Sequence, residues 1–148
     1  MLSIFEEKMD LLLANLGEAI DHEHDPIERV RRFARFHFDQ VRTNRAVSEV
    51  LQVELRLSNK FLKEYRPEKL WAYLAAFGQI VREGQELGLF RPEADPFITS
   101  WAFFGSLDEL AMQWVLSRNQ SRFPLEEAAD QISEIFIRGL LAEGQTLD

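Results

Sequence analysis

Residues 95–116, DPFITSWAFFGSLDELAMQWVL, are the stretch that decides the fold of this chain. At 100° per residue, the side chains of a helix with this sequence fall into three largely apolar strips and leave only a narrow polar side. Such a helix must be covered on more than one flank, so we expect a central helix that packs against its own domain and against a second copy of the chain. One strip combines two indoles, two phenyl rings and a carboxylate: Phe97, Trp101, Phe104, Asp108, Ala111, Trp114 and Val115. A second strip contains Ile98, Ala102, Gly105, Met112 and Leu116.

The rest of the chain predicts further helices with short polar connections. Asp25-Pro26 and Asp95-Pro96 each provide an N-cap carboxylate followed by a proline in the first helical turn. Gly88 is placed to end a helix with a left-handed cap. No segment has the period-two alternation of a strand. We therefore expect a single all-α domain over 1–148, with about six helices: Ser3 to Ile20, Asp25 to about Asn44, Ala46 to Ser58, Pro67 to Gly88, Asp95 to Leu116 and a last helix opened by Pro124.

Apolar residues at helical spacing indicate which faces are buried. The helix after Asp25 is expected to bury a face that includes His37 and Phe38, with Phe36 pointing elsewhere. In the first helix the expected face is Phe5, Met9, Leu12, Leu13, Leu16 and Ile20. In the helix after Pro67 it is Leu70, Leu74, Phe77, Val81 and Gly84, and in the last helix it is Ala128, Ile132, Ile135, Phe136 and Gly139.

Composition excludes several classes of protein. The chain has 148 residues and no cysteine, which excludes disulfide frameworks and thiolate chemistry and fits a reducing compartment. No signal peptide or bilayer-length apolar run is present, so we expect a cytoplasmic protein without membrane association. The formal net charge of −8 indicates that this segment does not itself wrap nucleic acid.

Two histidine-containing features could carry chemistry. The segment His22-Glu23-His24-Asp25 has metal-ligating side chains, but it lacks the paired spacing of ligands on a helix, and a solvated turn is the favoured interpretation. His37 lies on an apolar face and is interpreted as a neutral core residue with one hydrogen bond, with ligand contact as the alternative. No metal site is therefore expected.

Asp108 lies within the aromatic strip, where an unpaired carboxylate would be costly. Either it pairs with an arginine or histidine of a facing helix, or it faces a polar part of a bound ligand. No catalytic triad, Gly-rich phosphate loop or paired metal ligand motif is present, so neither an enzyme nor a cofactor is expected. The aromatic-rich helices with arginines near their edge suit an apolar ligand that carries an anionic group.

Three short segments resemble the regulatory domain of TetR-family transcriptional repressors, in particular the FadR-type members that respond to fatty acyl-CoA. The segments are Phe5-Glu6-Glu7-Lys8-Met9, Val53-Glu54-Leu55-Arg56-Leu57-Ser58-Asn59, and Phe104-Gly105-Ser106-Leu107-Asp108-Glu109 with Trp114-Val115. The resemblance implies a homodimer with a four-helix interface, and a long-chain acyl-CoA that enters between the helices and releases the operator of fatty acid degradation genes.

The resemblance also implies roles for individual residues. Candidates for the acyl wall are Phe33, Phe38, Leu51, Leu55, Trp71, Leu74, Phe104, Leu107 and Trp114. Candidates for the CoA or polar end are Arg31, Arg35, Arg56, Asn59 and Asp108, because guanidinium groups suit phosphate oxygens. Candidates for the dimer interface are Ala102, Gly105, Met112, Ile132 and Phe136.

Nothing in the chain resembles the N-terminal helix-turn-helix module of this family, so DNA binding is expected only through a domain that this chain lacks. Three alternatives remain open at this point. The domain could respond to a different hydrophobic effector, it could be a helical dimer module without a small-molecule site, or it could be a small enzyme that acts on acyl-CoA.

Overall fold

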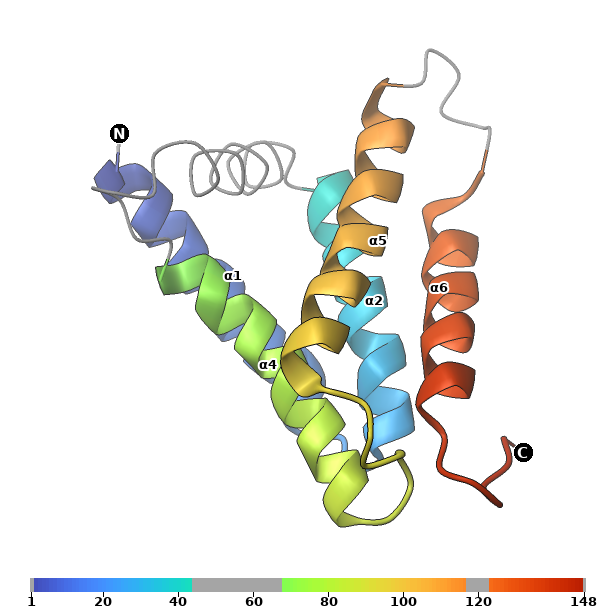
Figure 1. The fold of residues 1–148 in the computed structure, drawn as a ribbon. Coiled ribbons are helices and arrows are strands. Elements are labelled where there is room, and N and C mark those ends of the chain that lie inside the picture. Colours follow the sequence, from blue (N-terminus) through green and yellow to red (C-terminus); the bar gives the residue numbers. More distant parts are fainter. Residues whose placement is uncertain (1, 44–67, 117–122, 148) are drawn as a thin grey trace.

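The computed structural model of this protein describes residues 2–43, 68–116 and 123–147. These residues form the helices α1 (Leu2–Ile20), α2 (Pro26–Thr43), α4 (Glu68–Glu86), α5 (Pro96–Leu116) and α6 (Leu125–Leu140), as Figure 1 shows. Within these ranges there is no strand, which confirms the all-α prediction, and no helix long and apolar enough to cross a bilayer. The helix expected at 46–58 lies outside the described residues.

Helix α2 is the element around which the other helices pack, since it contacts α1, α4, α5 and α6 (Figure 1). Helix α5 contacts α2, α4 and α6, so the prediction that its own domain covers 95–116 on more than one flank is confirmed. It leaves Ile98, Ala102 and Gly105 exposed, and their cover by a second copy stays a prediction. The prediction that Phe36 points away from the core is wrong. Because α2 is covered on several sides, Phe36 is buried together with the residues of the expected face.

The predicted buried face of α4 is confirmed, and so, wherever its side chains are described, is that of α1 apart from Leu13, which is half-buried against the core. Met9, Leu12, Leu16 and Ile20 are buried on α1. On α4 the buried set includes all of Leu70, Leu74, Phe77, Val81 and Gly84, and also Tyr73 and Ile80.

The predicted face of α6 is correct only in part. Ala128 is buried, and Ile132 and Phe136 pack against the core, but Ile135 is 64% exposed and Gly139 is also exposed. The helix turns Ala129, Ser133 and Ile137 inward instead. The sequence of α6 carries two adjacent apolar strips, and its packing against α2 and α5 buries the strip that contains alanine and serine. Of the other strip, Ile135 stays on the surface of the single chain.

The helix ends follow the predicted capping signals. The Asp25 carboxylate accepts the backbone N–H of Ile27 at 3.0 Å, and the Asp95 carboxylate accepts the N–H groups of Phe97 and Ile98 at 2.8 and 3.1 Å. Gly88 has φ +75°, as expected for a left-handed cap. The end of α4 is a Schellman motif, in which the residue after Gly88 donates to the Gly84 carbonyl at 2.9 Å and Gly88 itself donates to Gln85 at 3.0 Å.

Gly84 allows the loop after α4 to fold back onto its own helix. A side chain at this position would overlap the buried ring of Phe90. The loop is then held to the C-terminal segment by an isolated antiparallel bridge, in which Arg91 donates to Leu140 at 2.7 Å and Ala142 donates to Leu89 at 2.8 Å. The packing of Phe90 on Gly84 holds the loop against α4, and the bridge then connects this loop to the end of α6.

We expect Gly84→Ala to destabilise the domain by about 1–3 kcal/mol in urea unfolding, because the new methyl group forces the Phe90 ring out of its position. The helix-propensity gain of alanine offsets less than about 1 kcal/mol of this loss. Gly17→Ala is the matched control, since its methyl group meets only the exposed carboxylate of Asp21. Equal or greater stability of both variants would contradict the packing described for Gly84.

Candidate functional site

A buried polar pair lies in the middle of the aromatic core, where α2, α4 and α5 meet. Nδ1 of His37 and the hydroxyl of Tyr73 are 2.8 Å apart and share a hydrogen bond, and both side chains are almost fully buried. The two rings are stacked with centroids 5.9 Å apart, and Phe104 of α5 meets both of them edge on. Phe33 is also stacked with Tyr73, with ring centroids 4.9 Å apart. The pair is therefore enclosed by aromatic rings.

Burial keeps this pair neutral. Desolvation lowers the pKa of His37 from 6.5 to about 4. Desolvation also raises the pKa of Tyr73, and the negative charge of Asp108 on α5 raises it further. His37 is thus the neutral, hydrogen-bonded core residue that the sequence favoured. Asp108 is half-buried, and its charge acts on the buried tyrosine.

Tyr73 is the residue that the sequence interpretation missed. It shares a helical row with Phe77, Ile80 and Gly84, at spacings of four, three and four residues. A buried tyrosine hydroxyl needs a hydrogen-bond partner, and His37 on the apolar face of another helix needed one too. The need of both side chains for a partner was the feature of the sequence that could have predicted this pair.

The predicted acyl-wall residues occupy different surroundings. Phe33, Phe38, Leu74, Phe104 and Leu107 are buried in one core cluster, where they pack against one another. Trp71 is 41% exposed, and Trp114 is half-buried. Leu51 and Leu55 lie outside the described residues, so the structure places only part of this predicted set.

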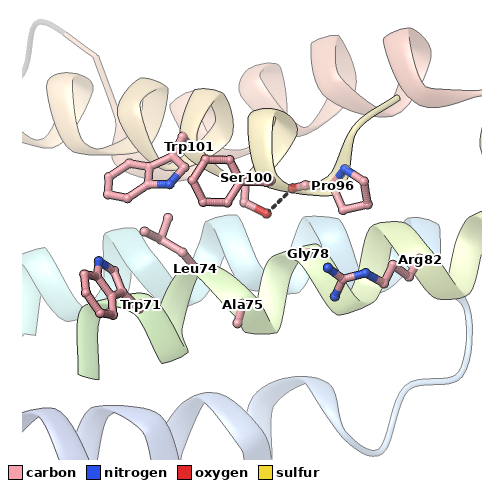
Figure 2. Close-up of a pocket in the computed structure, with 9 residues that line it drawn as sticks. Trp71, Leu74, Ala75, Gly78, Arg82, Pro96, Ser100 and Trp101 are labelled. Atoms are coloured by element: carbon pink, nitrogen blue, oxygen red, sulfur yellow. Dashed lines mark hydrogen bonds between the residues drawn. The ribbon is translucent and has the colours of Figure 1, made fainter. Parts of the chain in front are cut away.

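A groove between α4 and α5 brings two of the predicted wall residues together, as Figure 2 shows. Its volume is about 140 Å³, which is below the ~300–1,000 Å³ of sites that enclose a drug-sized ligand. Trp71 and Trp101 lie at one end, and Arg82 lies at the other end beside Pro96. The complete lining is Trp71, Leu74, Ala75, Gly78, Arg82, Pro96, Phe97, Ser100 and Trp101.

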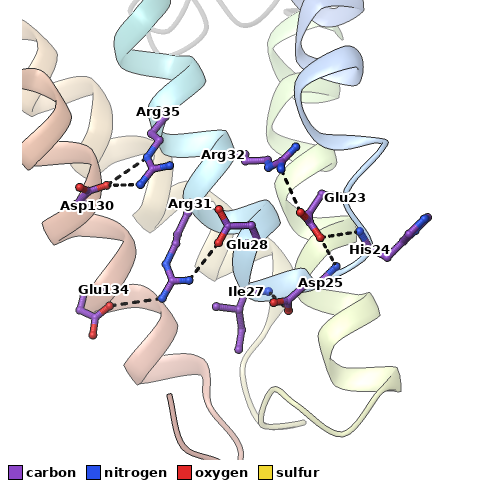
Figure 3. Close-up of polar contacts among 10 residues, drawn as sticks. All are labelled: Glu23, His24, Asp25, Ile27, Glu28, Arg31, Arg32, Arg35, Asp130 and Glu134. Atoms are coloured by element: carbon purple, nitrogen blue, oxygen red, sulfur yellow. Dashed lines mark hydrogen bonds and ion pairs between the residues drawn. The ribbon is translucent and has the colours of Figure 1, made fainter. Parts of the chain in front are cut away.

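The predicted polar-end arginines of α2 are engaged by carboxylates (Figure 3). Arg31 pairs with Glu28 at 3.2 Å and with Glu134 of α6 at 4.0 Å, and Arg35 pairs with Asp130 of α6 at 3.1 Å. Both arginines therefore face α6, whereas the groove lies between α4 and α5. Arg56 and Asn59 lie outside the described residues.

The segment between α1 and α2 is a capped turn. Glu23 accepts the backbone N–H groups of His24 and Asp25, each at 3.1 Å, and pairs with Arg32 at 3.2 Å (Figure 3). The hydrogen bond from Asp25 is the main cause that lowers the pKa of Glu23. In the described part of the chain, no group of three or more His, Cys, Asp or Glu residues could hold a metal ion.

The described residues fold as an all-helical domain. A family model described as the C-terminal region of YsiA-like proteins, of the TetR class, matches residues 5–139. Because this match covers most of the chain, the protein belongs to that TetR-type C-terminal family. The resemblance inferred from the three short segments is thereby confirmed.

Relatives include regulators of fatty acid metabolism. The fatty acid metabolism regulator protein of Bacillus subtilis (strain 168) is 26% identical over 140 residues, which are 95% of this chain and 71% of that protein. The structure of the transcriptional regulator FadR from Bacillus subtilis in complex with stearoyl-CoA has a TM-score of 0.78 at 27% identity, over 93% of this chain and 73% of that one. The fatty acid degradation regulator FadR from Bacillus halodurans has a TM-score of 0.77 at 28% identity, over 93% and 70% of the two chains.

Burial of neutral His37 predicts a specific pH dependence of stability. The unfolded chain binds a proton on His37 near pH 6.5, and the folded chain binds it only near pH 4. The folded state therefore loses stability as the pH falls from 6.5 to 4, by up to about 3 kcal/mol from this residue.

We expect the free energy of urea unfolding to fall less steeply over this range in His37→Asn than in the natural protein. Asparagine does not titrate, and its amide can still pair with the Tyr73 hydroxyl. The carboxylates are the same in both proteins, so their contribution to the pH slope cancels when the two slopes are compared. Identical pH slopes would show that His37 is not buried in its neutral form.

Proposed function

We propose that this chain is the effector-binding domain of a FadR-type transcriptional repressor and that its effector is a long-chain fatty acyl-CoA. The observation that carries the proposal is the likeness to the Bacillus subtilis FadR structure, whose bound ligand is stearoyl-CoA, across 93% of this chain. The aromatic cluster around Tyr73 supports it, since it concentrates apolar surface where α2, α4 and α5 meet. Such surface suits an acyl tail.

Binding would act on the parent repressor as a population shift. The core packs ring on ring, as the stacked pair Phe77 and Phe103 at 4.1 Å illustrates, so entry of an acyl chain requires the helices to move. A ligand that fits only the moved arrangement favours it by its difference in affinity for the two states. Helix α1, which packs on α2 and α4, would carry this change toward a DNA-binding domain, and the operator would be released.

Stearoyl-CoA should raise the thermal midpoint of this chain, whereas free CoA should leave it unchanged. A ligand that binds only the folded state adds about 2.7 kcal/mol of stability at a hundredfold excess over its Kd. Stearate serves as the second control and tests whether the head group contributes. The ligand should be recovered intact after incubation, as expected of a regulator. No shift with stearoyl-CoA at concentrations up to its solubility would contradict the proposed effector.

We also propose that the chain forms a homodimer through α5 and α6. The outer strip of α5 contains Ile98, which is 67% exposed, and the small residues Ala102 and Gly105, which allow close approach of a second helix. Beside it, α5 and α6 line a groove of about 340 Å³ to which Leu110, Ile132 and Ile135 contribute. This uncovered apolar surface is of the kind that a second copy covers. Met112, Ile132 and Phe136 of the predicted interface are half-buried.

Gly105→Arg and Ile135→Arg should each shift the protein from dimer to monomer in analytical ultracentrifugation. A guanidinium group placed in an apolar interface is costly unless it finds a partner there. Leu11→Arg is the matched control, because Leu11 is similarly exposed but lies on α1, away from the proposed interface. A dimer that survives both α5 and α6 substitutions would contradict this arrangement, and so would a monomeric natural protein.

A further inference from the structure

The α4–α5 groove (the lining residues named above) is an uncovered aromatic surface. Phe97 is 71% exposed and Trp71 is 41% exposed, and the ring of Trp101, which also lines the groove, lies 6.3 Å from that of Phe97. Exposed aromatic side chains that cluster in one place mark a surface that binds a ligand or a partner, because a contiguous apolar patch in water is unfavourable unless something covers it. The small residues Gly78 and Ser100 also line the groove, and a Cβ added at Gly78 would lie 3.1 Å from the Ser100 hydroxyl, so the two helices are close here.

The groove has a cation at one end only. Arg82 is exposed and, among the described residues, makes no ion pair or side-chain hydrogen bond. This distinguishes it from the arginines of α2, each of which pairs with a carboxylate: Arg29, Arg31, Arg32, Arg35 and Arg42. Trp71 and Arg82 are eleven residues apart on one helix, so their Cα atoms are about 16 Å apart along its axis.

The aromatic end of the groove leads into the core. The ring of Trp101 meets Phe104 edge on at 6.4 Å, and Phe104 in turn meets Tyr73 at 6.1 Å. Leu74 lines the groove and is itself buried. An apolar chain that displaced the Trp101 side chain would therefore reach the rings that surround the His37–Tyr73 pair.

We propose that the α4–α5 groove is the mouth of the effector site. The indoles of Trp71 and Trp101 contact the apolar chain where it enters the core, and the Arg82 guanidinium binds an anionic group that stays outside. The ligand chemistry is an unbranched apolar chain with an anion, which is either a free fatty acid carboxylate or the phosphates of an acyl-CoA. The assignment rests on the proposed function for its ligand class, and it goes further by assigning the place of entry and the anion contact.

Titrations of Arg82→Gln with stearoyl-CoA and with stearate test the anion contact. We expect the Kd to rise about threefold to fivefold at low ionic strength, as for the loss of an exposed ion pair, and the difference to shrink in about 0.5 M salt. The ligand whose Kd responds identifies the source of the anion. Arg91→Gln is the matched control, because Arg91 is an exposed arginine on the loop after α4 and does not line the groove.

Tryptophan quenching tests the location directly. A stearoyl-CoA brominated on its chain quenches the fluorescence of indoles that it contacts, and the chain has only three tryptophans. We expect Trp71→Phe and Trp101→Phe each to remove part of the quenched signal while the ligand still binds. If the quenched signal belongs entirely to Trp114, the ligand enters elsewhere and the assignment is overturned.

The outcomes separate this assignment from the proposed function. If the natural protein binds neither stearoyl-CoA nor stearate, the ligand class is wrong. If the natural protein binds, but the Kd of Arg82→Gln equals that of Arg91→Gln and neither groove indole is quenched, the ligand class stands and the α4–α5 groove is not the site. Circular dichroism and the thermal midpoint without ligand establish that each variant folds.

Discussion

The arrangement of the helices depends on one buried interaction, the hydrogen bond between His37 of α2 and Tyr73 of α4. Each polar group would be costly in an aromatic core without the other, by about 1–3 kcal/mol. The stacked Phe33 and the edge-on Phe104 leave the two rings little freedom to part. The hydrogen bond therefore aligns α2 with α4, and the surrounding rings add α5 to the same point. The α4–α5 groove adjoins this cluster through Trp101, whose ring meets that of Phe104.

Local features of the fold were predictable from the sequence because they depend on neighbouring residues. The Asp25 and Asp95 caps and the left-handed Gly88 were correct for this reason. Features that depend on how the helices pack against one another were not predictable. The apolar sequence of 95–116 indicated a helix covered on several flanks, but nothing local showed that α2 contacts four other helices and buries Phe36.

The candidate site was predictable in its composition but not in its geometry. Trp71 and Leu74 were singled out and do lie together in the α4–α5 groove. Arg31 and Arg35 were singled out as cations, but α6 supplies carboxylates to both, and no local pattern in α2 reveals partners about a hundred residues away. Arg82 was not singled out, because only the folded chain distinguishes an arginine without a carboxylate partner from its paired counterparts.

The ion pairs between α2 and α6 show how these two helices are aligned. Arg31 faces Glu134 and Arg35 faces Asp130, so the two helices run antiparallel with matching four-residue steps. A slip of one turn in either direction would still place a carboxylate opposite Arg35, Glu134 in one case and Glu126 in the other. Each exposed pair also stabilises the fold only weakly. The ion pairs therefore leave the choice of register to the apolar contacts, in which Ala129 and Ile137 of α6 are buried, and these contacts decide which residues α6 presents on the proposed dimer surface.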